Sequence, residues 1–455
     1  MSVGFLVHFV NNTSFGVTLT AKVKDSGDWE SDKTARPDLN IKGVSLRPYS
    51  AGVSFFHEER HDNRDSAPFT VNAKFSNQET ISFVLDGCDA TGMVNDGRVP
   101  VTSQSGDFSV FQVMSPAGDN GFKWNLMSVF ITPKVSPKGW MGRLIEKNPS
   151  LTLPEITIPG THDTGTYNGN GEEGTRCQTM DIRTQLNAGI RFMDLRLRLA
   201  GDDLAIHHAS YFQNLWLKKD VLPAITQFLA ENPTECVVLL VNHAVDGDAS
   251  INDKLHEILV QGVPANKLYD HNDAAAFPLT LSSLQGCVVL MRRDKGANGE
   301  REMTFGIDAT EWPDDKAYDH FNAGGTTIQL QDAYRTGFAD ISTKWKRITR
   351  HLERAKADKS KDWFINFTSV SSKDAPCLPW FPWGYATGDD TPQWGINSLL
   401  TRYLVRNTYS YLDPQADHHL HFTKGRLGTV VMDFPEEPGK KFLIRLLIAM
   451  NELSV

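Results

Sequence analysis

The first part of the chain shows the alternation of apolar and polar residues that is typical of β-strands. Its short runs are rich in β-branched and aromatic residues, and clusters of Asn, Gly, Asp and Pro separate them. The runs are FLVHFV, FGVTLTAKV, GVSFF, FTVNAKF, TISFVL, FSVFQVM and WNLMSVFIT. No long run in this region has helical periodicity. The spacing predicts an all-β sandwich over residues 1–133.

From Leu151 onward, apolar strand-like runs alternate with segments of helical periodicity. The strand-like runs are ITIPG, RFMDLRL, LAIHH, CVVLLVN, CVVLMRR, TTIQL, DWFINFT and LGTVVMDF. The helix-periodic segments between and after them are TMDIRTQLNAGI, LWLKKDVLPAITQFLAEN, INDKLHEILVQG, KWKRITRHLERAKA, GINSLLTRYLVRN and KKFLIRLLIAMNE. This alternation is typical of α/β proteins with a mostly parallel sheet. We therefore expect residues 134–455 to form a distorted (β/α) TIM-type barrel.

In a (β/α) barrel, functional side chains gather at the carboxyl ends of the strands. The expected strands do end in polar or ionisable residues, namely His162, Asp163, Asp194, Arg196, Arg198, His207, His208, Asn242, His243, Arg292, Arg293, Asp332, Tyr334 and Asp433. Taken singly, each is more often a structural hydrogen-bonding group or a salt-bridged strand end than a catalytic residue. Their convergence at one mouth favours an active site, because burying many charges together is costly unless they are paired and used.

The composition narrows the class of protein. The chain has 455 residues, of which 40 % are hydrophobic and 22 % charged, as in globular proteins. A net charge of −9 argues against general electrostatic binding of nucleic acid. The 5 cysteines are widely spaced and do not predict a disulfide framework. No apolar run reaches the roughly 20 residues of a membrane span, and no basic region opens a signal peptide. We expect a soluble protein that is cytoplasmic or exported without such a signal.

The residue types at the expected mouth suit chemistry at a phosphate. Two histidines provide one base and one acid near neutral pH, and carboxylates behind them would fix their tautomers. An arginine fork matches phosphate oxygens. The competing interpretation is a Ca²⁺ or Mg²⁺ site, which needs several carboxylates on one face. Arg196, a fixed cation, lies at the centre of the face that carries Asp194 and Arg198, so we expect no metal and no cofactor.

Several segments carry a specific resemblance to a known family. The segments ITIPGTHDTGTY, RFMDLRLRL followed by LAIHHA, FLAENPTE and FINFTSVSS resemble bacterial phosphatidylinositol-specific phospholipase C in sequence, order and spacing. The likeness runs from about Lys138 to the end of the chain. It implies a distorted (β/α) barrel and a calcium-independent enzyme, a phosphatidylinositol diacylglycerol-lyase. Such an enzyme releases diacylglycerol and forms inositol 1,2-cyclic phosphate.

The resemblance assigns catalytic roles to five residues. It implies that His162 is the general base for the inositol 2-hydroxyl and that Asp433 supports it. His208, paired with Asp163, would be the general acid toward the diacylglycerol oxygen. Arg196 would clamp the phosphate in the place where calcium-dependent relatives hold Ca²⁺.

The resemblance also implies a binding site for the inositol headgroup. Asp332 and Arg293 would bind inositol hydroxyls, Tyr334 would stack on the ring, and Asp194 would support Arg196 or the histidines. The family has a lysine where this chain has Asn242, which removes one charged contact to the inositol hydroxyls. Whether free phosphatidylinositol or a glycosyl-phosphatidylinositol anchor is preferred stays open, as does the oligomeric state.

Two further regions point to a membrane. The aromatic residues Trp380, Phe381 and Trp383 lie in a proline-interrupted loop near the expected mouth, where they suit the boundary between water and lipid. The alternative is that they pack against the other domain. Residues 1–133 resemble aegerolysin-type membrane-binding sandwiches in pattern, which implies a lipid- or glycan-binding module; the alternative is a domain that only covers the barrel. The expected partner is a membrane surface that contains phosphatidylinositol, bound peripherally.

Two other functions remain alternatives to the phospholipase. One is a metal-dependent glycerophosphodiesterase or sphingomyelinase on a similar barrel, which needs a carboxylate-rich metal site. The other is a catalytically inactive lipid-binding protein. Arg196 argues against the first, and the complete set of acid–base residues argues against the second.

Overall fold

The computed structural model describes most of the chain. The described residues are 2–11, 13, 15–22, 29–30, 44–47, 50–59, 69–85, 108–115, 125–133, 136–169, 173–245, 249–269, 280–294, 305–323, 325–372, 380–388, 391, 394–407, 426–437 and 442–454. By their contacts they divide into two compact units. The first is formed mainly by residues 1–135, and the second mainly by residues 136–400 together with 425–437 and 443–455.

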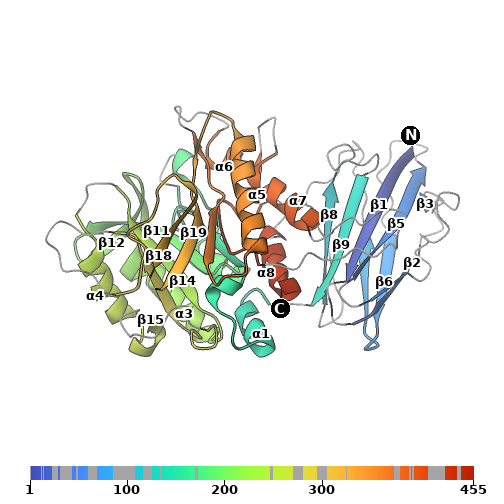
Figure 1. The fold of residues 1–455 in the computed structure, drawn as a ribbon, viewed down its shortest axis with the longest axis horizontal. Coiled ribbons are helices and arrows are strands. Elements are labelled where there is room, and N and C mark those ends of the chain that lie inside the picture. Colours follow the sequence, from blue (N-terminus) through green and yellow to red (C-terminus); the bar gives the residue numbers. More distant parts are fainter. Residues whose placement is uncertain are drawn as a thin grey trace. The chain divides into compact units, whose positions relative to one another are not determined.

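The first unit contains two β-sheets (Figure 1). One has the strand order β3-β5-β1-β9-β8, and the other has the order β4-β2-β6-β7. The strands are β1 Ser2–Asn11, β2 Val17–Lys22, β3 Trp29–Glu30, β4 Val44–Leu46, β5 Ser50–Glu59, β6 Phe69–Phe75, β7 Thr80–Leu85, β8 Phe108–Ser115 and β9 Asn125–Pro133. Every β-rich run predicted from the sequence falls on one of these strands.

Alternating burial explains why the first unit forms sheets. On β6, Val71, Ala73 and Phe75 are buried, whereas Lys74 between them is exposed. Neighbouring strands bury the same face, with Leu19 on β2 and Phe83 on β7 inaccessible to solvent. This period of two places one face of the sheet against a core.

The rest of the chain is a mixed α/β fold. Its strands are β10 Ile158–Thr161, β11 Phe192–Ala200, β12 Asp203–His208, β13 Tyr211–Trp216, β14 Val237–His243, β15 Leu268–Tyr269, β16 Val288–Arg292, β17 Ile307–Asp308, β18 Ala317–Ala323, β19 Thr326–Gln331, β20 Arg335–Thr336, β21 Trp363–Phe367, β22 Ser371–Ser372 and β23 Thr429–Met432. Its helices are α1 Trp140–Lys147, α2 Ile182–Ala188, α3 Leu222–Glu231, α4 Asn252–Gly262, α5 Ile341–Ala357, α6 Pro382–Thr387, α7 Ile396–Asn407 and α8 Phe442–Ser454. Short turns of other helices are η1 Leu153–Glu155, η2 Glu173–Thr175, η3 Leu217–Val221 and η4 Ala265–Lys267.

A curled sheet forms the centre of the second unit (Figure 1). Its strands run in the order β15-β16-β14-β11-β10-β23-β21-β19-β18, and neighbours from β16 to β19 are parallel. Residues 237–241 of β14 are all buried, as expected of a parallel strand covered on both faces. The predicted mixed α/β fold is therefore confirmed, as a curled half-barrel. Parallel pairing also brings the carboxyl ends of β10, β11, β14 and β23 to one rim.

One predicted element is wrong in part. The sequence LWLKKDVLPAITQFLAEN predicts a single helix, but Leu215 and Trp216 belong to β13, and regular α-helix begins only at Leu222. β13 pairs antiparallel with β12, which extends the strand that ends in His208 into a hairpin. The aromatic residues Phe212 and Trp216 pack on each other along this hairpin, and such packing outweighs helical periodicity.

None of the helices in the described part of the chain is long and apolar enough to span a membrane.

A buried ion pair ties helix α1 to the sheet. Arg191, which precedes β11, and Glu235, which precedes β14, are both inaccessible to solvent, with Nη2 of Arg191 2.8 Å from Oε2 of Glu235. Arg191 also donates to the backbone carbonyls of Pro137 and Lys138. Glu235 accepts from the backbone N–H of Gly142 in the first turn of α1. Glu235 closes the FLAENPTE segment, so part of that segment has a structural role.

We expect Glu235→Ala to lower the free energy of unfolding by about 3–5 kcal/mol, because it leaves the Arg191 charge buried and unpaired. Chemical denaturation with fluorescence detection measures this. The matched control is Glu231→Ala, which removes a partly exposed ion pair with Arg183 and should cost less than about 1 kcal/mol. Equal effects of the two substitutions would show that the buried pair has no special role.

Candidate active site

The turn after β10 places His162 and Asp163 at the rim of the sheet. Asp163 has φ 41°, in the left-handed region that few residues other than glycine adopt. The backbone N–H of Thr164 donates to the carbonyl of Asp194, which fixes the turn against β11. Gly165 has no room for a side chain, since a Cβ there would lie 2.6 Å from Cγ2 of Ile206. The PGTHDTG sequence therefore encodes a tight turn that presents two ionisable side chains.

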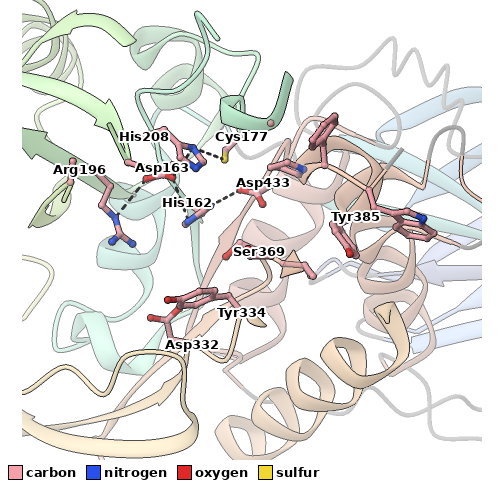
Figure 2. A pocket seen from close by; sticks show the side chains of 18 of the residues that line it. His162, Asp163, Cys177, Arg196, His208, Asp332, Tyr334, Ser369, Tyr385 and Asp433 are labelled. Carbon is pink, nitrogen blue, oxygen red and sulfur yellow. Dashed lines mark hydrogen bonds and ion pairs between the residues drawn. The ribbon is translucent and has the colours of Figure 1, made fainter. Parts of the chain in front are cut away.

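A cavity of about 460 Å³ opens at this rim (Figure 2). It lies within the second unit. Its lining residues come from β11, β12, α6 and the loops near the strand ends, and they include His162, Asp163, Cys177, Arg196, His208, Asp314, Asp332, Tyr334, Ser369, Trp380, Phe381, Tyr385 and Asp433. The structure thus brings together all five residues that the sequence analysis assigned to catalysis.

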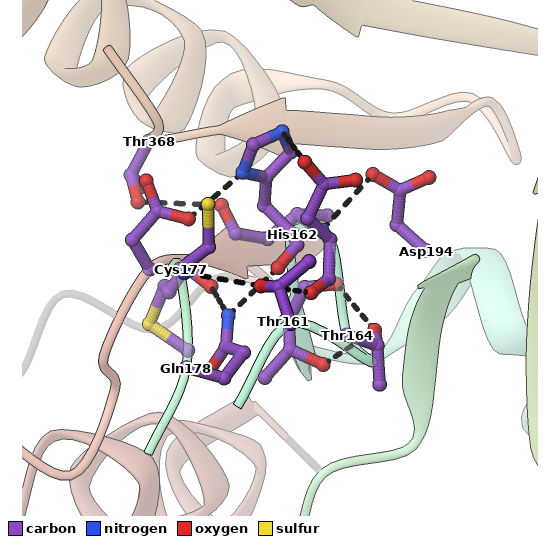
Figure 3. A network of polar contacts seen from close by, with 12 residues as sticks. Thr161, His162, Thr164, Cys177, Gln178, Asp194 and Thr368 are labelled. Carbon is purple, nitrogen blue, oxygen red and sulfur yellow. Dashed lines mark hydrogen bonds and ion pairs between the residues drawn. The ribbon is translucent and has the colours of Figure 1, made fainter. Parts of the chain in front are cut away.

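His162 is held by a carboxylate at its ring and by a hydrogen bond to its backbone carbonyl. Its Nδ1 lies 2.8 Å from Oδ1 of Asp433, at the end of β23. Nε2 of Gln178 donates to the carbonyl oxygens of His162 and Met432, which joins the ends of β10 and β23 (Figure 3). Burial alone would lower the pKa of His162, but the charges of Asp433 and Asp163 outweigh it and hold the pKa well above its ordinary value. His162 is therefore a stronger base than a free histidine.

Asp163 lies between two histidine rings and a guanidinium. Its Oδ2 is 3.3 Å from Nδ1 of His208 and 3.7 Å from Nε2 of His162. Its Oδ1 is 3.6 Å from Nε of Arg196. Burial would raise the pKa of Asp163, but His162, His208 and Arg196 together lower it below the ordinary value. Asp163 is therefore ionised and couples the two histidines. Nδ1 of His208 also lies 3.1 Å from the carbonyl oxygen of Thr175, which further fixes the ring.

Arg196 is held in a fork by Asp194. Its Nε and Nη2 donate to the two carboxylate oxygens of Asp194 at 2.9 and 3.0 Å. Burial opposes the charge of Arg196, but Asp194 and Asp163 raise its pKa above the ordinary value. Asp194 is inaccessible to solvent, whereas Arg196 is partly exposed and lines the cavity. The site therefore presents a permanently charged guanidinium, and the buried carboxylate of Asp194 fixes its orientation.

Asp332 and Tyr334, two of the expected headgroup residues, lie in a second wall of the cavity. Asp332 accepts a hydrogen bond from Nε1 of Trp312 at 2.8 Å. The hydroxyl of Tyr334 donates to Oδ2 of Asp314 at 3.0 Å, and Nη2 of Arg293 lies 3.4 Å from Oδ1 of the same carboxylate. Arg293 also stacks over the ring of Trp312, with its guanidinium carbon 4.5 Å from the ring centroid. Burial lowers the pKa of Arg293 and raises that of Asp332.

Three of the expected substrate-binding residues do not line the cavity. Arg293 contacts Asp314, and Asp194 holds Arg196, both of which do line it. Asn242 pairs with Arg196 in the ladder between β14 and β11, and its side chain is partly exposed. All three are therefore neighbours of lining residues.

The expectation for Trp380 needs a correction. Trp380 is only 6 % exposed, so its ring is not free to enter a membrane. It packs on Tyr385 and Phe338, with ring centroids 5.2 and 6.1 Å away. Phe381 lines the cavity, and Trp383 lies in α6 with its ring edge against Phe434. Burial of Trp380 in this aromatic cluster follows from tertiary packing, which the spacing of the loop residues does not reveal.

Three residues at the site were missed from the sequence. Phe338 is 46 % exposed beside Trp380. Asp314 joins Tyr334 and Arg293, and Cys177 lies next to the histidines. All three are in loops, so inspecting strand ends could not find them. The WPDD sequence around Asp314, with two carboxylates after a tryptophan, was the one available signal.

Metal ligation is restricted by the same contacts. Three groups of close donor side chains lie at the rim, and one of them joins His162, Asp163 and Asp194. Because Arg196 already engages both oxygens of Asp194, that group is a poor site for Ca²⁺ or Mg²⁺. The other two groups contain Cys177, which is a soft ligand.

Comparisons with known proteins identify relatives of the second unit. Residues 156–294 match the family model for phosphatidylinositol-specific phospholipase C, X domain. A 1-phosphatidylinositol phosphodiesterase of Staphylococcus aureus is 29 % identical over 249 residues, which cover 52 % of this chain and 76 % of the relative. That of Listeria monocytogenes is 26 % identical over 348 residues, covering 74 % and 94 %.

Solved structures show the same fold. The phosphatidylinositol-specific phospholipase C of Listeria monocytogenes aligns with a TM-score of 0.52 at 26 % identity, covering 70 % of this chain and 99 % of that one. The Staphylococcus aureus enzyme gives a TM-score of 0.56 at 24 % identity, covering 70 % and 98 %. Together these findings support a bacterial-type phosphatidylinositol-specific phospholipase C.

We expect Asp433→Asn to lower the pKa of His162, because Asp433 is the charge that raises it most. Titration of labelled histidine rings by NMR measures the change. The control is Asp308→Asn, which removes an exposed carboxylate that lies 3.9 Å from Arg292. An unchanged His162 titration in Asp433→Asn would mean that the pair does not form in solution.

Proposed function

We propose, from its likeness to bacterial-type phosphatidylinositol-specific phospholipases C, that this chain is an enzyme of that family. It would cleave phosphatidylinositol without a metal to diacylglycerol and inositol 1,2-cyclic phosphate. The observation that carries the proposal is the arrangement of His162, His208 and Arg196 around Asp163 in one cavity. It supplies a base, an acid and a phosphate-binding cation within reach of one reacting group.

The reaction follows from these roles. His162, with Nδ1 committed to Asp433, takes the proton of the inositol 2-hydroxyl on Nε2. The oxygen forms a bond to phosphorus, the bond from phosphorus to the diacylglycerol oxygen breaks, and His208 donates a proton to that oxygen. Arg196 stabilises the charge on the phosphate oxygens, because its position is set in advance by Asp194. Asp163 couples the two histidines, so that each favours the protonation state the other needs.

Headgroup selection belongs to the second wall. Asp332 and Tyr334 face the cavity, and Arg293 holds Asp314 in place. We assign inositol hydroxyls to Asp332, with Tyr334 packing on the ring. Asn242 lies next to Arg196 and provides a neutral contact where the family has a lysine.

Membrane binding is proposed to be peripheral. Phe338 is exposed at the aromatic cluster beside the cavity, and Phe381 and Trp383 adjoin it. Aromatic rings at such a rim suit the interface between water and lipid. The two sheets formed by residues 1–133 would pack as a β-sandwich that adds a second contact to lipid or glycan, and residues 134–455 would form the distorted barrel.

We expect His162→Ala and His208→Ala each to lower kcat by roughly 10²- to 10⁴-fold, the usual contribution of an acid or base. Arg196→Lys should also be impaired, since a point charge cannot replace the planar fork. Phosphorus NMR of products from phosphatidylinositol vesicles in chelator measures both rate and product. Activity that disappears in chelator and returns with Ca²⁺ would instead support the metal-dependent alternative.

We expect Phe338→Ser to weaken vesicle binding several-fold, because it removes apolar surface at the rim. Turnover of a monomeric short-chain substrate should be retained. Val260→Ser on α4 is the control, since Val260 is 56 % exposed but, unlike Phe338, does not pack on Trp380 in the cavity wall. Equal loss on vesicles and on the monomeric substrate would show that Phe338 has a structural role.

A further inference from the structure

Cys177 lies beside the catalytic histidines but has no part in the proposed reaction. It is fully buried in the wall of the cavity, and its Sγ is 3.8 Å from Nδ1 of His208 (Figure 2). It also contacts the ring of His162 (Figure 3). Burial raises the pKa of the thiol to about 12, so it is neutral and unreactive as a nucleophile. The thiol can still act as a metal ligand, a role that the proposed reaction does not use.

The donor atoms around Cys177 have the spacing of a tetrahedral site. Zinc bonds of about 2.0–2.3 Å place neighbouring donors roughly 3.3–3.8 Å apart. Oδ2 of Asp163 lies 3.3 Å from Nδ1 of His208, and Sγ of Cys177 lies 3.8 Å from the same nitrogen. One atom from each of Asp163, Cys177 and His208 lies within 4.8 Å of the others. These three residues would leave the fourth position of a tetrahedral zinc ion to water.

The donor types select the metal. A thiol, an imidazole and a carboxylate oxygen suit zinc, whereas Ca²⁺ and Mg²⁺ require several oxygens. The positive charge of Arg196 faces the other oxygen of Asp163, Oδ1, at 3.6 Å, so Oδ2 remains directed at the histidines. The carboxylate of Asp433, paired with His162, adds negative charge nearby. A cation that displaces the thiol proton therefore meets a preformed set of ligands.

We propose that Asp163, Cys177 and His208 form an inhibitory zinc site. The inhibition rests on the proposed function, since zinc would bind His208, the proposed acid, and would take the Asp163 oxygen that couples it to His162. The site would make a metal-independent enzyme sensitive to zinc but not to calcium or magnesium.

Binding is tested without reference to activity. The metal-free full chain is titrated with Zn²⁺ against a chromogenic chelator, and with Co²⁺ to detect the thiolate-to-cobalt charge-transfer band. We expect one tight site, and at least about tenfold weaker binding with loss of the band in Cys177→Ser. Cys287→Ser, which alters another buried thiol outside the cavity, should bind as the unmodified chain does. Binding that is weak, or independent of Cys177, overturns the proposal.

Inhibition is then measured with each variant normalised to its own rate in chelator. Zn²⁺ should inhibit reversibly, Ca²⁺ and Mg²⁺ at the same concentration should not, and Cys177→Ser should need at least about tenfold more Zn²⁺. Equal sensitivity of Cys177→Ser and the unmodified chain would overturn the proposal. A chain that binds zinc through Cys177 but is inactive in chelator would refute the proposed function and leave the metal site standing.

Discussion

The site depends on one buried carboxylate, Asp163, which contacts two histidine rings and a guanidinium. Oδ2 of Asp163 contacts His208 and His162, and Oδ1 faces Arg196. A carboxylate buried among apolar strands would be protonated, and these neighbours are what keep it charged. In return, Asp163 keeps two histidines and a guanidinium close together despite their mutual repulsion. Any change that moves Asp163 therefore alters the acid, the base and the phosphate clamp at once.

Several uncommon features of the backbone hold that carboxylate in place. Asp163 has a positive φ, and Gly165 behind it leaves no room for a side chain. Nε2 of Gln178 donates to the carbonyl of Met432 on one side of the turn. The backbone N–H of Thr164 donates to the carbonyl of Asp194 on the other side. Backbone strain of this kind persists only where the surroundings over-determine it. The rigid parallel strands on both sides of β10 provide such surroundings.

Much of this could be predicted from the sequence, and the limits are physical. Periodicity located the strands and helices, and parallel strands bring their carboxyl ends together, which is why His162 and Asp433 could be grouped from positions far apart in the chain. His208 ends β12, which runs antiparallel to β11 and returns to the same rim. Periodicity carries no information on what packs around a loop residue. The burial of Trp380, the exposure of Phe338 and the β13 hairpin depend on contacts between distant segments, so they emerged only from the structure.

The same reasoning explains why acid–base chemistry and metal binding compete at this rim. A histidine with a carboxylate behind it is both a good base and a good ligand, because each property needs an available lone pair of raised basicity. Arg196 removes Asp194 from the reach of hard cations by engaging both of its oxygens. It does nothing to shield Cys177 and His208, which lie on the other side of Asp163. Metal binding near the histidines is therefore selective. Arg196 disfavours ions that need oxygen ligands, such as Ca²⁺ and Mg²⁺, whereas a softer ion can bind the sulfur of Cys177 and the nitrogen of His208.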